Sequence, residues 1–369
     1  MESTPLRLAY LADPNSVHTR RWIGFFADRG HEVHLLVGID DEVRPGLHDR
    51  VQVHRYRRFD RRRLPLLSSL QSRAALRALL ARLRPDVLHA HYISRYGWQA
   101  RLSGFHPYVV TPWGSDLFVT PPRRSNRARL WARWTLRSAN LVTVMSTQME
   151  EAVVAMGARR DRVRRVQFGV DTTRFTPAPT ARQGFDRRFF FSPRALRPLY
   201  QHTTVLEAMA ALPADIGLVM SGRNADPVYR SRLETQAATL GLTSRLTIID
   251  EIDDDMMLTL YRTCMAVISV PRSDGLPVTV LEAMACGSPV VGSDLPAVRE
   301  LLQPVSPRLI VPVGDAQGLA DAMLAVLDMS PDERSMIGGG LRSRVVAEAD
   351  QATNMVRMEG LYRQLADHA

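Results

Sequence analysis

The chain has 369 residues, of which 45% are hydrophobic and 23% charged, so it is long enough for two globular domains. No run approaches the roughly 18 apolar residues of a membrane-spanning helix, and residues 1–12 lack the order of a signal peptide. All 48 basic residues are arginine, which excludes a lysine Schiff base with pyridoxal phosphate and a lysine-containing phosphate loop. The two cysteines, Cys264 and Cys286, form no disulfide framework or metal cluster, so we expect a cytoplasmic protein.

The first half of the sequence predicts alternating strands and helices. Ser16 is a candidate helix cap, and the helix after it ends near Gly30. Short apolar runs without helical periodicity are typical of buried parallel strands. They occur at residues 6–12, 31–37, 86–91, 108–111, 141–145 and 163–167.

Polar residues follow several of these predicted strands. His91 ends one strand, Trp113 and Asp116 follow the next, and Asn15 and Ser16 follow the first. Because parallel α/β sheets bind ligands beyond the carboxyl ends of their strands, His91 is a candidate contact for a sugar hydroxyl.

The first half is strongly basic. Residues 1–180 contain 30 arginines against 15 acidic residues, whereas residues 181–369 contain 18 against 23. Such a surplus favours an anionic partner, which could be lipid headgroups, a lipid-pyrophosphate acceptor or nucleic acid. The basic run 55–63 fits a solvated face or a lipid-facing one. The mixture of arginine and tryptophan at 121–138 fits a helix at a membrane interface and, equally, a half-buried surface helix.

A linker rich in proline, threonine and alanine at 176–183 precedes a second series of predicted strands. The acidic triplet 253–255 precedes a helix, where carboxylates satisfy the first N–H groups and the helix dipole. We interpret it as a cap and not as a metal site. The apolar runs lie at residues 188–193, 216–220, 246–249, 265–270, 288–292 and 309–313.

The most informative stretch is 271–287, with the sequence PRSDGLPVTVLEAMACG. Proline at position 277 suits the start of a helix, and Gly287 suits its end. A helix start offers N–H groups and a positive dipole to a phosphate. Asp274 precedes this start and Glu282 lies about one and a half turns into the helix, and carboxylates accept hydrogen bonds from sugar hydroxyls. The stretch therefore predicts a site for an anion and a polyol.

Asp274 and Glu282, with seven residues between them, resemble the two-acid motif of the retaining family 4 glycosyltransferases. The segment 283–291, AMACGSPVV, is similar to that family nearly letter for letter. The opening turn 29–33 and the segment 168–175 also resemble the family. This chain has Asp274 where the family usually has Glu, and Trp113 where the family has a His.

The resemblance implies an α/β chain with the GT-B fold, in which two Rossmann-like domains face each other across a cleft. It implies an acceptor-binding domain at 1–175 and a domain at 176–349 that binds the nucleotide-sugar. A C-terminal helix, within 350–369, is expected to cross back to the first domain.

The resemblance also implies roles for individual residues. Arg194, Asp274 and Glu282 are the expected catalytic residues, with Glu282 on the ribose, Asp274 on the transferred sugar and Arg194 on the diphosphate. No metal or cofactor is expected. The expected acceptor contacts are Asn15, Ser16, His91, Trp113 and Asp116. The expected donor contacts are Arg194, Arg197, Gly222, Ile252, Gly275, Leu276, Pro277, Val278 and Glu282.

The implied activity is retaining, metal-independent transfer of a sugar from a nucleotide-sugar to a hydroxyl of a saccharide, lipid-linked or small-metabolite acceptor. A UDP-sugar is favoured over GDP-mannose as donor. Two alternatives stay open: a sugar-nucleotide epimerase or hydrolase with the same fold, and a non-catalytic nucleotide-binding homologue. A nucleic-acid binder would leave the acid motif unexplained, so we expect no nucleic-acid partner. Contact with the inner face of an anionic membrane through the basic half is a further expectation.

Overall fold

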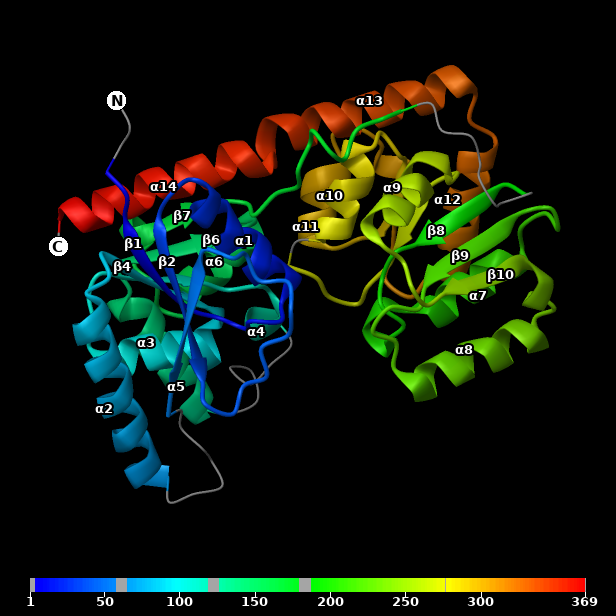
Figure 1. Cartoon of the computed structure of the whole chain (residues 1–369). Helices are drawn as coiled ribbons and strands as arrows, with labels where there is room; N and C mark the ends of the chain where they lie inside the picture. Colours follow the sequence, from blue (N-terminus) through cyan, green and yellow to red (C-terminus); the bar gives the residue numbers. More distant parts are fainter. Residues whose placement is uncertain (1–3, 58–64, 119–125, 179–186, 276, 369) are drawn as a thin grey trace. The chain divides into compact units, whose positions relative to one another are not determined.

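The computed structural model describes residues 4–57, 65–118, 126–178, 187–275 and 277–368. The chain forms two compact units, Met1–Phe168 with Ala352–Ala369 and Gly169–Gln351, each with its own parallel sheet (Figure 1). The sequence placed the boundary after residue 175. The segment 169–175 instead lies in the second unit, where Val170 pairs with Asp350 and the Phe175 ring lies 6.2 Å from that of Tyr261.

The first unit contains a seven-stranded sheet in the order β3-β2-β1-β4-β5-β6-β7. Its central strands are buried on both faces, which explains why they appear in the sequence as continuous apolar runs. The strands are β1 (Arg7–Leu11), β2 (Glu32–Gly38), β3 (Val51–Tyr56), β4 (Val87–His91), β5 (Tyr108–Thr111), β6 (Leu141–Val144) and β7 (Val163–Arg165).

The chain winds outward from β1 in both directions, so the sheet has a topological switch point between β1 and β4. Ser16 caps α1 by accepting a hydrogen bond from the Thr19 N–H, as the sequence predicts. A π-helix, η1 (Tyr92–Gly97), directly follows β4. The α-helices are α1 (Val17–Asp28), α2 (Pro65–Leu83), α3 (Trp98–Ser103), α4 (Ser115–Phe118), α5 (Asn126–Ser138) and α6 (Thr147–Ala155).

The last helix, α14 (Gln351–Asp367), completes the first unit, which confirms the predicted return of the C-terminal helix. It lies on the side of the sheet away from α2, α3 and α5 (Figure 1). The buried Tyr362 hydroxyl lies 3.3 Å from the Tyr10 hydroxyl, accepts a hydrogen bond from the indole of Trp22 at 3.2 Å, and contacts His89. The core of the first unit therefore contains residues from both ends of the chain.

The second unit contains a six-stranded parallel sheet in the order β10-β9-β8-β11-β12-β13, with its switch point between β8 and β11. Asp253 caps α9 by accepting from the Met256 N–H at 2.7 Å, as predicted. The strands are β8 (Phe189–Ser192), β9 (Gly217–Ser221), β10 (Leu246–Ile249), β11 (Val267–Ser269), β12 (Val290–Ser293) and β13 (Ile310–Val311).

Among the described residues of the second unit, seven α-helices cover its sheet. Helix α13 packs closely against the end of α10. A Cβ atom added at Gly338 of α13 would lie 2.1 Å from the carbonyl oxygen of Gly287, which directly follows α10. No described helix of either unit combines the length and hydropathy needed to cross a bilayer. The helices are α7 (His202–Ala210), α8 (Pro227–Thr239), α9 (Asp254–Thr263), α10 (Val278–Ala285), α11 (Pro296–Leu302), α12 (Ala316–Leu327) and α13 (Pro331–Glu348).

Candidate active site

Two loops of the second unit meet at its switch point, one after β8 and one after β11. Arg194 of the first loop donates to the Asp274 carboxylate at 2.7 Å and to the Thr279 hydroxyl at 3.1 Å. The side chains of Arg194 and Asp274 are only 12% and 14% exposed. The carboxyl edge of a parallel sheet at its switch point is where α/β proteins bind ligands.

Tyr200 holds the Arg194 guanidinium from another side, with its ring centroid 4.3 Å from the central carbon. Burial lowers the pKa of Arg194, but Asp274 and Tyr200 outweigh that effect and hold the pKa above its usual value. The site therefore contains a permanent, well-fixed positive charge.

Further contacts join the two loops. Gln201 has a left-handed backbone with φ of 52°, and its side-chain amide donates to the Val270 carbonyl at 2.8 Å. The Arg272 N–H donates to the Leu199 carbonyl at 2.9 Å. A non-glycine residue in this conformation persists only where its surroundings hold it, so the loops are ordered before a ligand arrives.

The start of α10 lies beside this charge. Pro277 is its N-cap residue and Val278 its first residue, so the helix begins one residue later than the sequence suggested. Within the part of the chain that the structure describes, this helix start has no side-chain capping hydrogen bond. The Gly275 N–H donates to the Asp274 carboxylate at 2.8 Å, and Leu276 lies outside the described residues. Asp274 thus connects Arg194 to the chain entering α10.

Glu282 lies inside α10 with only 7% of its surface exposed. It accepts a hydrogen bond at 3.0 Å from the hydroxyl of Tyr261 in α9, and the Tyr261 ring lies 5.6 Å from that of Phe191. Burial and the nearby Glu282 raise the pKa of Tyr261, so the phenol stays a donor. Sequence reasoning missed both Tyr261 and Tyr200, because neither belongs to the acid motif.

The remaining predicted donor residues lie around these loops. A Cβ atom at Gly222 would lie 2.3 Å from an Asp250 carboxylate oxygen and 3.2 Å from the Asp250 Cα, so the space around Gly222 is crowded by residues of the second unit itself. Ile252 is 5% exposed and packs in the hydrophobic core. Arg197 is exposed at the start of the 3₁₀ turn Pro198–Tyr200, whereas Tyr200 itself contacts Arg194.

The predicted acceptor residues of the first unit lie at the carboxyl ends of β4 and β5. His91 is fully buried, and its ring lies 5.4 Å from that of the half-buried Trp113. Trp113 in turn stacks on His18, with ring centroids 5.0 Å apart. Burial, with a smaller effect of His18, lowers the pKa of His91 to about 3, so its imidazole is neutral near pH 7. His91 thus lies within this aromatic cluster.

The Asp116 carboxylate forms hydrogen bonds within the first unit. Its carboxylate accepts the Ile93 N–H at 2.8 Å and the Trp113 N–H at 2.9 Å, and the residue is 2% exposed. Burial raises the pKa of Asp116 to about 6 although these N–H groups oppose the shift. The structure therefore brings Asp116, Trp113 and His91 together at one edge of the sheet.

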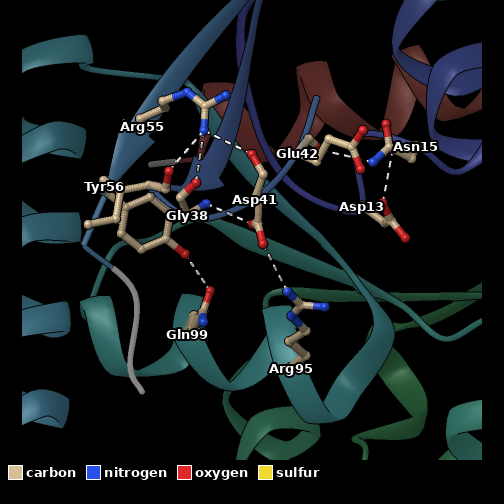
Figure 2. A network of polar contacts seen from close by, with 10 residues as sticks. Asp13, Asn15, Gly38, Asp41, Glu42, Arg55, Tyr56, Arg95 and Gln99 are labelled. Carbon is tan, nitrogen blue, oxygen red and sulfur yellow. Dashed lines mark hydrogen bonds and ion pairs between the residues drawn. The ribbon is translucent and has the colours of Figure 1, made fainter. Parts of the chain in front are cut away.

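Asn15 fastens the loop after β2 to the start of α1. Its amide donates to the Glu42 carbonyl at 2.8 Å, and its side-chain oxygen accepts the Arg44 N–H at 3.0 Å. The Asn15 N–H donates to Asp13 at 2.9 Å (Figure 2). The side chains of Asn15 and Ser16 thus both hold the chain at this edge.

The same loop is connected to neighbouring elements by charged groups. Arg55 of β3 donates to the carbonyls of Ile39 and Asp41 at 3.1 and 2.9 Å. The Asp41 carboxylate accepts the Gly38 N–H at 2.8 Å and lies 3.3 Å from Arg95 of η1 (Figure 2). The loop is therefore held beside the predicted acceptor residues.

Comparison with protein families divides the chain as the structure does. Residues 7–146 match the model described as "Glycosyl transferase 4-like", and residues 180–341 match "Glycosyl transferases group 1".

Curated relatives match parts of the chain. Lipopolysaccharide core biosynthesis mannosyltransferase LpsB of Rhizobium meliloti is 30% identical over 190 residues, 48% of this chain and 54% of the relative. D-inositol 3-phosphate glycosyltransferase of Mycolicibacterium smegmatis is 25% identical over 67% of this chain and 60% of the relative. The matches thus span about half to three fifths of these relatives. GDP-mannose-dependent alpha-mannosyltransferase of Mycobacterium tuberculosis is 28% identical over 78% of this chain and 76% of the relative.

Solved structures of similar architecture cover nearly the whole chain. Sucrose-phosphate synthase from Thermosynechococcus elongatus superposes with a TM-score of 0.81 at 20% identity, covering 98% of this chain and 99% of that one. Anabaena HepE, solved with UDP and glucose, has a TM-score of 0.79 at 18% identity, covering 98% and 100%. At this identity the likeness establishes the fold.

Proposed function

Because the chain belongs to the group 1 glycosyltransferases with the GT-B fold, we propose that it transfers a sugar from a nucleotide-sugar to an acceptor hydroxyl with retention and without a metal ion. The observation that carries this proposal is the buried Arg194, fixed by Asp274 at 2.7 Å beside the uncapped start of α10. A unit charge about 4 Å from a phosphate oxygen contributes roughly 4 kcal/mol in a partly wet site, before desolvation. That contribution is the one a metal ion would otherwise make to the leaving group.

Three residues divide the recognition of the donor in this proposal. Arg194 and the N–H groups from Gly275 to Val278 bind the diphosphate. Glu282, held by Tyr261, accepts hydrogen bonds from the ribose hydroxyls, and Asp274 accepts them from the transferred sugar. The exposed Arg197 is an outer contact for the diphosphate.

The proposed reaction needs no nucleophile from the protein. The bond between the anomeric carbon and the diphosphate oxygen breaks, and the acceptor oxygen forms its bond on the same face of the sugar. The acceptor proton passes to the departing phosphate oxygen, while Arg194 stabilises the charge that develops there. Retention follows because both bonds lie on one face.

We favour UDP as the nucleotide and keep GDP as the second choice. HepE was solved with UDP and with UDP-glucose, and the M. tuberculosis relative is named for GDP-mannose. For the acceptor, a saccharide, a lipid-linked sugar or a small metabolite, Trp113 offers an aromatic face to a sugar ring. In this proposal Asn15, Ser16, His91 and Asp116 hold the surrounding surface in shape.

Thermal unfolding in the presence of UDP- and GDP-sugars tests the proposal first, because a ligand that binds the native state raises Tm. The stabilising sugar is then supplied with candidate acceptors, with and without EDTA, and the product anomer is determined by NMR. We expect stabilisation by one nucleotide class, activity in EDTA and a retained anomer. No stabilisation, loss of activity in EDTA or an inverted product would each contradict the proposal.

Two other activities are compatible with the same donor site. An epimerase or hydrolase would consume the nucleotide-sugar without any acceptor, and a non-catalytic homologue would bind it without consuming it. The replacement of a family histidine by Trp113 does not distinguish an epimerase or hydrolase from a non-catalytic homologue, since tryptophan stacks on sugars but transfers no proton. Donor consumption measured without and with acceptor distinguishes the three.

A further inference from the structure

Helix α5 of the first unit exposes large apolar side chains. Leu130, Trp131 and Trp134 are 44%, 41% and 48% exposed. The opposite face of the helix is buried against the first unit through Ala132, Thr135 and Leu136. Since the inner face is already packed, Leu130 and Trp134 are not needed to hold α5 on its sheet.

The same outward face is basic. Six arginines and no acidic residue lie between Asp116 and Glu150. Four of these arginines are in α5, and all four are exposed: Arg127, Arg129, Arg133 and Arg137.

Helical geometry sorts these residues into rows. Residues four apart lie on one side of a helix, so Arg129, Arg133 and Arg137 form one row. Leu130 and Trp134 form the next row around the helix. The Trp131 ring stacks on that of Trp98 from α3, with centroids 5.1 Å apart at 10°. An apolar row edged by cations, with tryptophans among them, is the arrangement of a helix lying in the plane of a membrane interface.

We propose that the outward face of α5 binds the surface of an anionic phospholipid bilayer. The lipid phosphates attract the exposed arginines of α5, and Leu130 and Trp134 enter the headgroup region. A second copy of this chain would bring two basic faces together, and a nucleic acid would leave the apolar row unused. Only the bilayer satisfies both kinds of side chain. This proposal goes beyond sugar transfer and does not depend on it.

The test uses the full chain with vesicles of phosphatidylcholine, pure or mixed with phosphatidylglycerol. Sedimentation measures binding, and quenching of tryptophan fluorescence by brominated lipid measures insertion. We expect binding that rises with phosphatidylglycerol and falls with added salt. Removing two cations in R127Q/R137Q should weaken binding about twenty-five-fold, since each basic residue near such a surface is worth about fivefold.

The apolar row is tested with L130S/W134S, which leaves the Trp98–Trp131 stack in place. This variant should lose quenching and bind at least about tenfold more weakly. Matched controls are R232Q/R357Q and V228S/M336S, which alter exposed residues on other helices. Both controls should bind like the unchanged protein, and unchanged thermal unfolding confirms that each variant is folded.

Three results would overturn the proposal: equal binding to neutral and anionic vesicles, no binding to either, or unchanged binding by L130S/W134S. Concentration-dependent dimerisation that L130S/W134S abolishes would instead assign this face to a second copy. Donor binding by the second unit is measured separately, so failure of the membrane proposal leaves the transferase proposal standing.

Discussion

Arg194 and Asp274 form a 2.7 Å ion pair between the two loops at the switch point of the second unit. The carboxylate that holds the cation is also the one expected to contact the transferred sugar. In the proposed site a donor diphosphate binds the same guanidinium, so it must compete with Asp274 for Arg194. A substitution of Asp274 should therefore lower turnover without lowering the affinity for the nucleotide.

Replacing Asp274 by Asn should lower kcat at least about tenfold, while the affinity for UDP stays equal or increases. The reason is that the variant leaves the Arg194 charge without its counter-ion, and a hydrogen bond to a charged group is worth roughly 1.5–3 kcal/mol. Calorimetry with UDP and steady-state kinetics measure the two effects. As a control, D294N removes an exposed ion pair with Arg299 and should change neither quantity. Weaker binding of UDP by D274N would contradict the assignment.

Tyr261→Phe should raise KM for the donor about tenfold with little change in kcat. The hydroxyl donates to Glu282 at 3.0 Å in a buried setting, and its loss frees the carboxylate to leave the ribose position at a cost of about 1.5 kcal/mol. Tyr229→Phe is the matched control, since the Tyr229 hydroxyl is buried in the same unit and has no hydrogen-bond partner among the described residues. If both variants raised KM equally, the effect would be one of folding.

Gly338 and Gly339 are neighbours in α13, but replacing each by alanine should change the stability in opposite directions. A Cβ atom at Gly338 would lie 2.1 Å from the Gly287 carbonyl oxygen, whereas one at Gly339 would have no atom within 4 Å. G338A should therefore destabilise the protein by about 1–3 kcal/mol through overpacking. G339A should stabilise it by about 0.5–1 kcal/mol, because alanine loses less conformational freedom in a helix. Chemical denaturation measures both, and equal values would refute the close contact of α10 with α13.

His202 should make the second unit sensitive to acid. Burial lowers the pKa of this fully buried imidazole to about 4, although the nearby Arg194 backbone opposes the shift. Because the unfolded chain binds the proton more readily, stability is complete above about pH 6.5 and falls as the pH drops toward 4. At pH 5 the loss is roughly 2 kcal/mol. H202L should lose less stability between pH 7 and 5 than the unchanged protein, and an equal loss would exclude this role.

The elements that the sequence predicts well are those fixed by local chemistry. Central strands appear as apolar runs because both faces are buried, and Ser16 and Asp253 act as caps because their side chains satisfy adjacent N–H groups. The edge strand β3 was not predicted. Its exposed Gln52, Val53 and Arg55 interrupt the apolar pattern that marks the other strands.

In the candidate site, only the residues that belong to a sequence motif or follow a predicted strand could be predicted. Asp274 and Glu282 are close in sequence, and Arg194 follows a recognisable strand. Tyr261 contacts Glu282, 21 residues further along the chain. Tyr200 contacts Arg194 of the same loop through the turn Pro198–Tyr200, and the motif pattern marks neither tyrosine. The resemblance named Arg197 beside Arg194 as a donor contact, which stays a prediction. It did not mark Tyr200, which a tight turn places against the Arg194 guanidinium.

The position of α14 affects how the protein is made. Residues 352–367 are translated after the whole second unit, so the contacts of Trp22 and His89 with Tyr362 cannot form until that unit has been made. The second unit is continuous in sequence, whereas the first, although its synthesis begins earlier, is complete only once α14 has been translated. During that interval the apolar side chains that α14 later covers stay exposed, which is the condition in which incomplete domains aggregate.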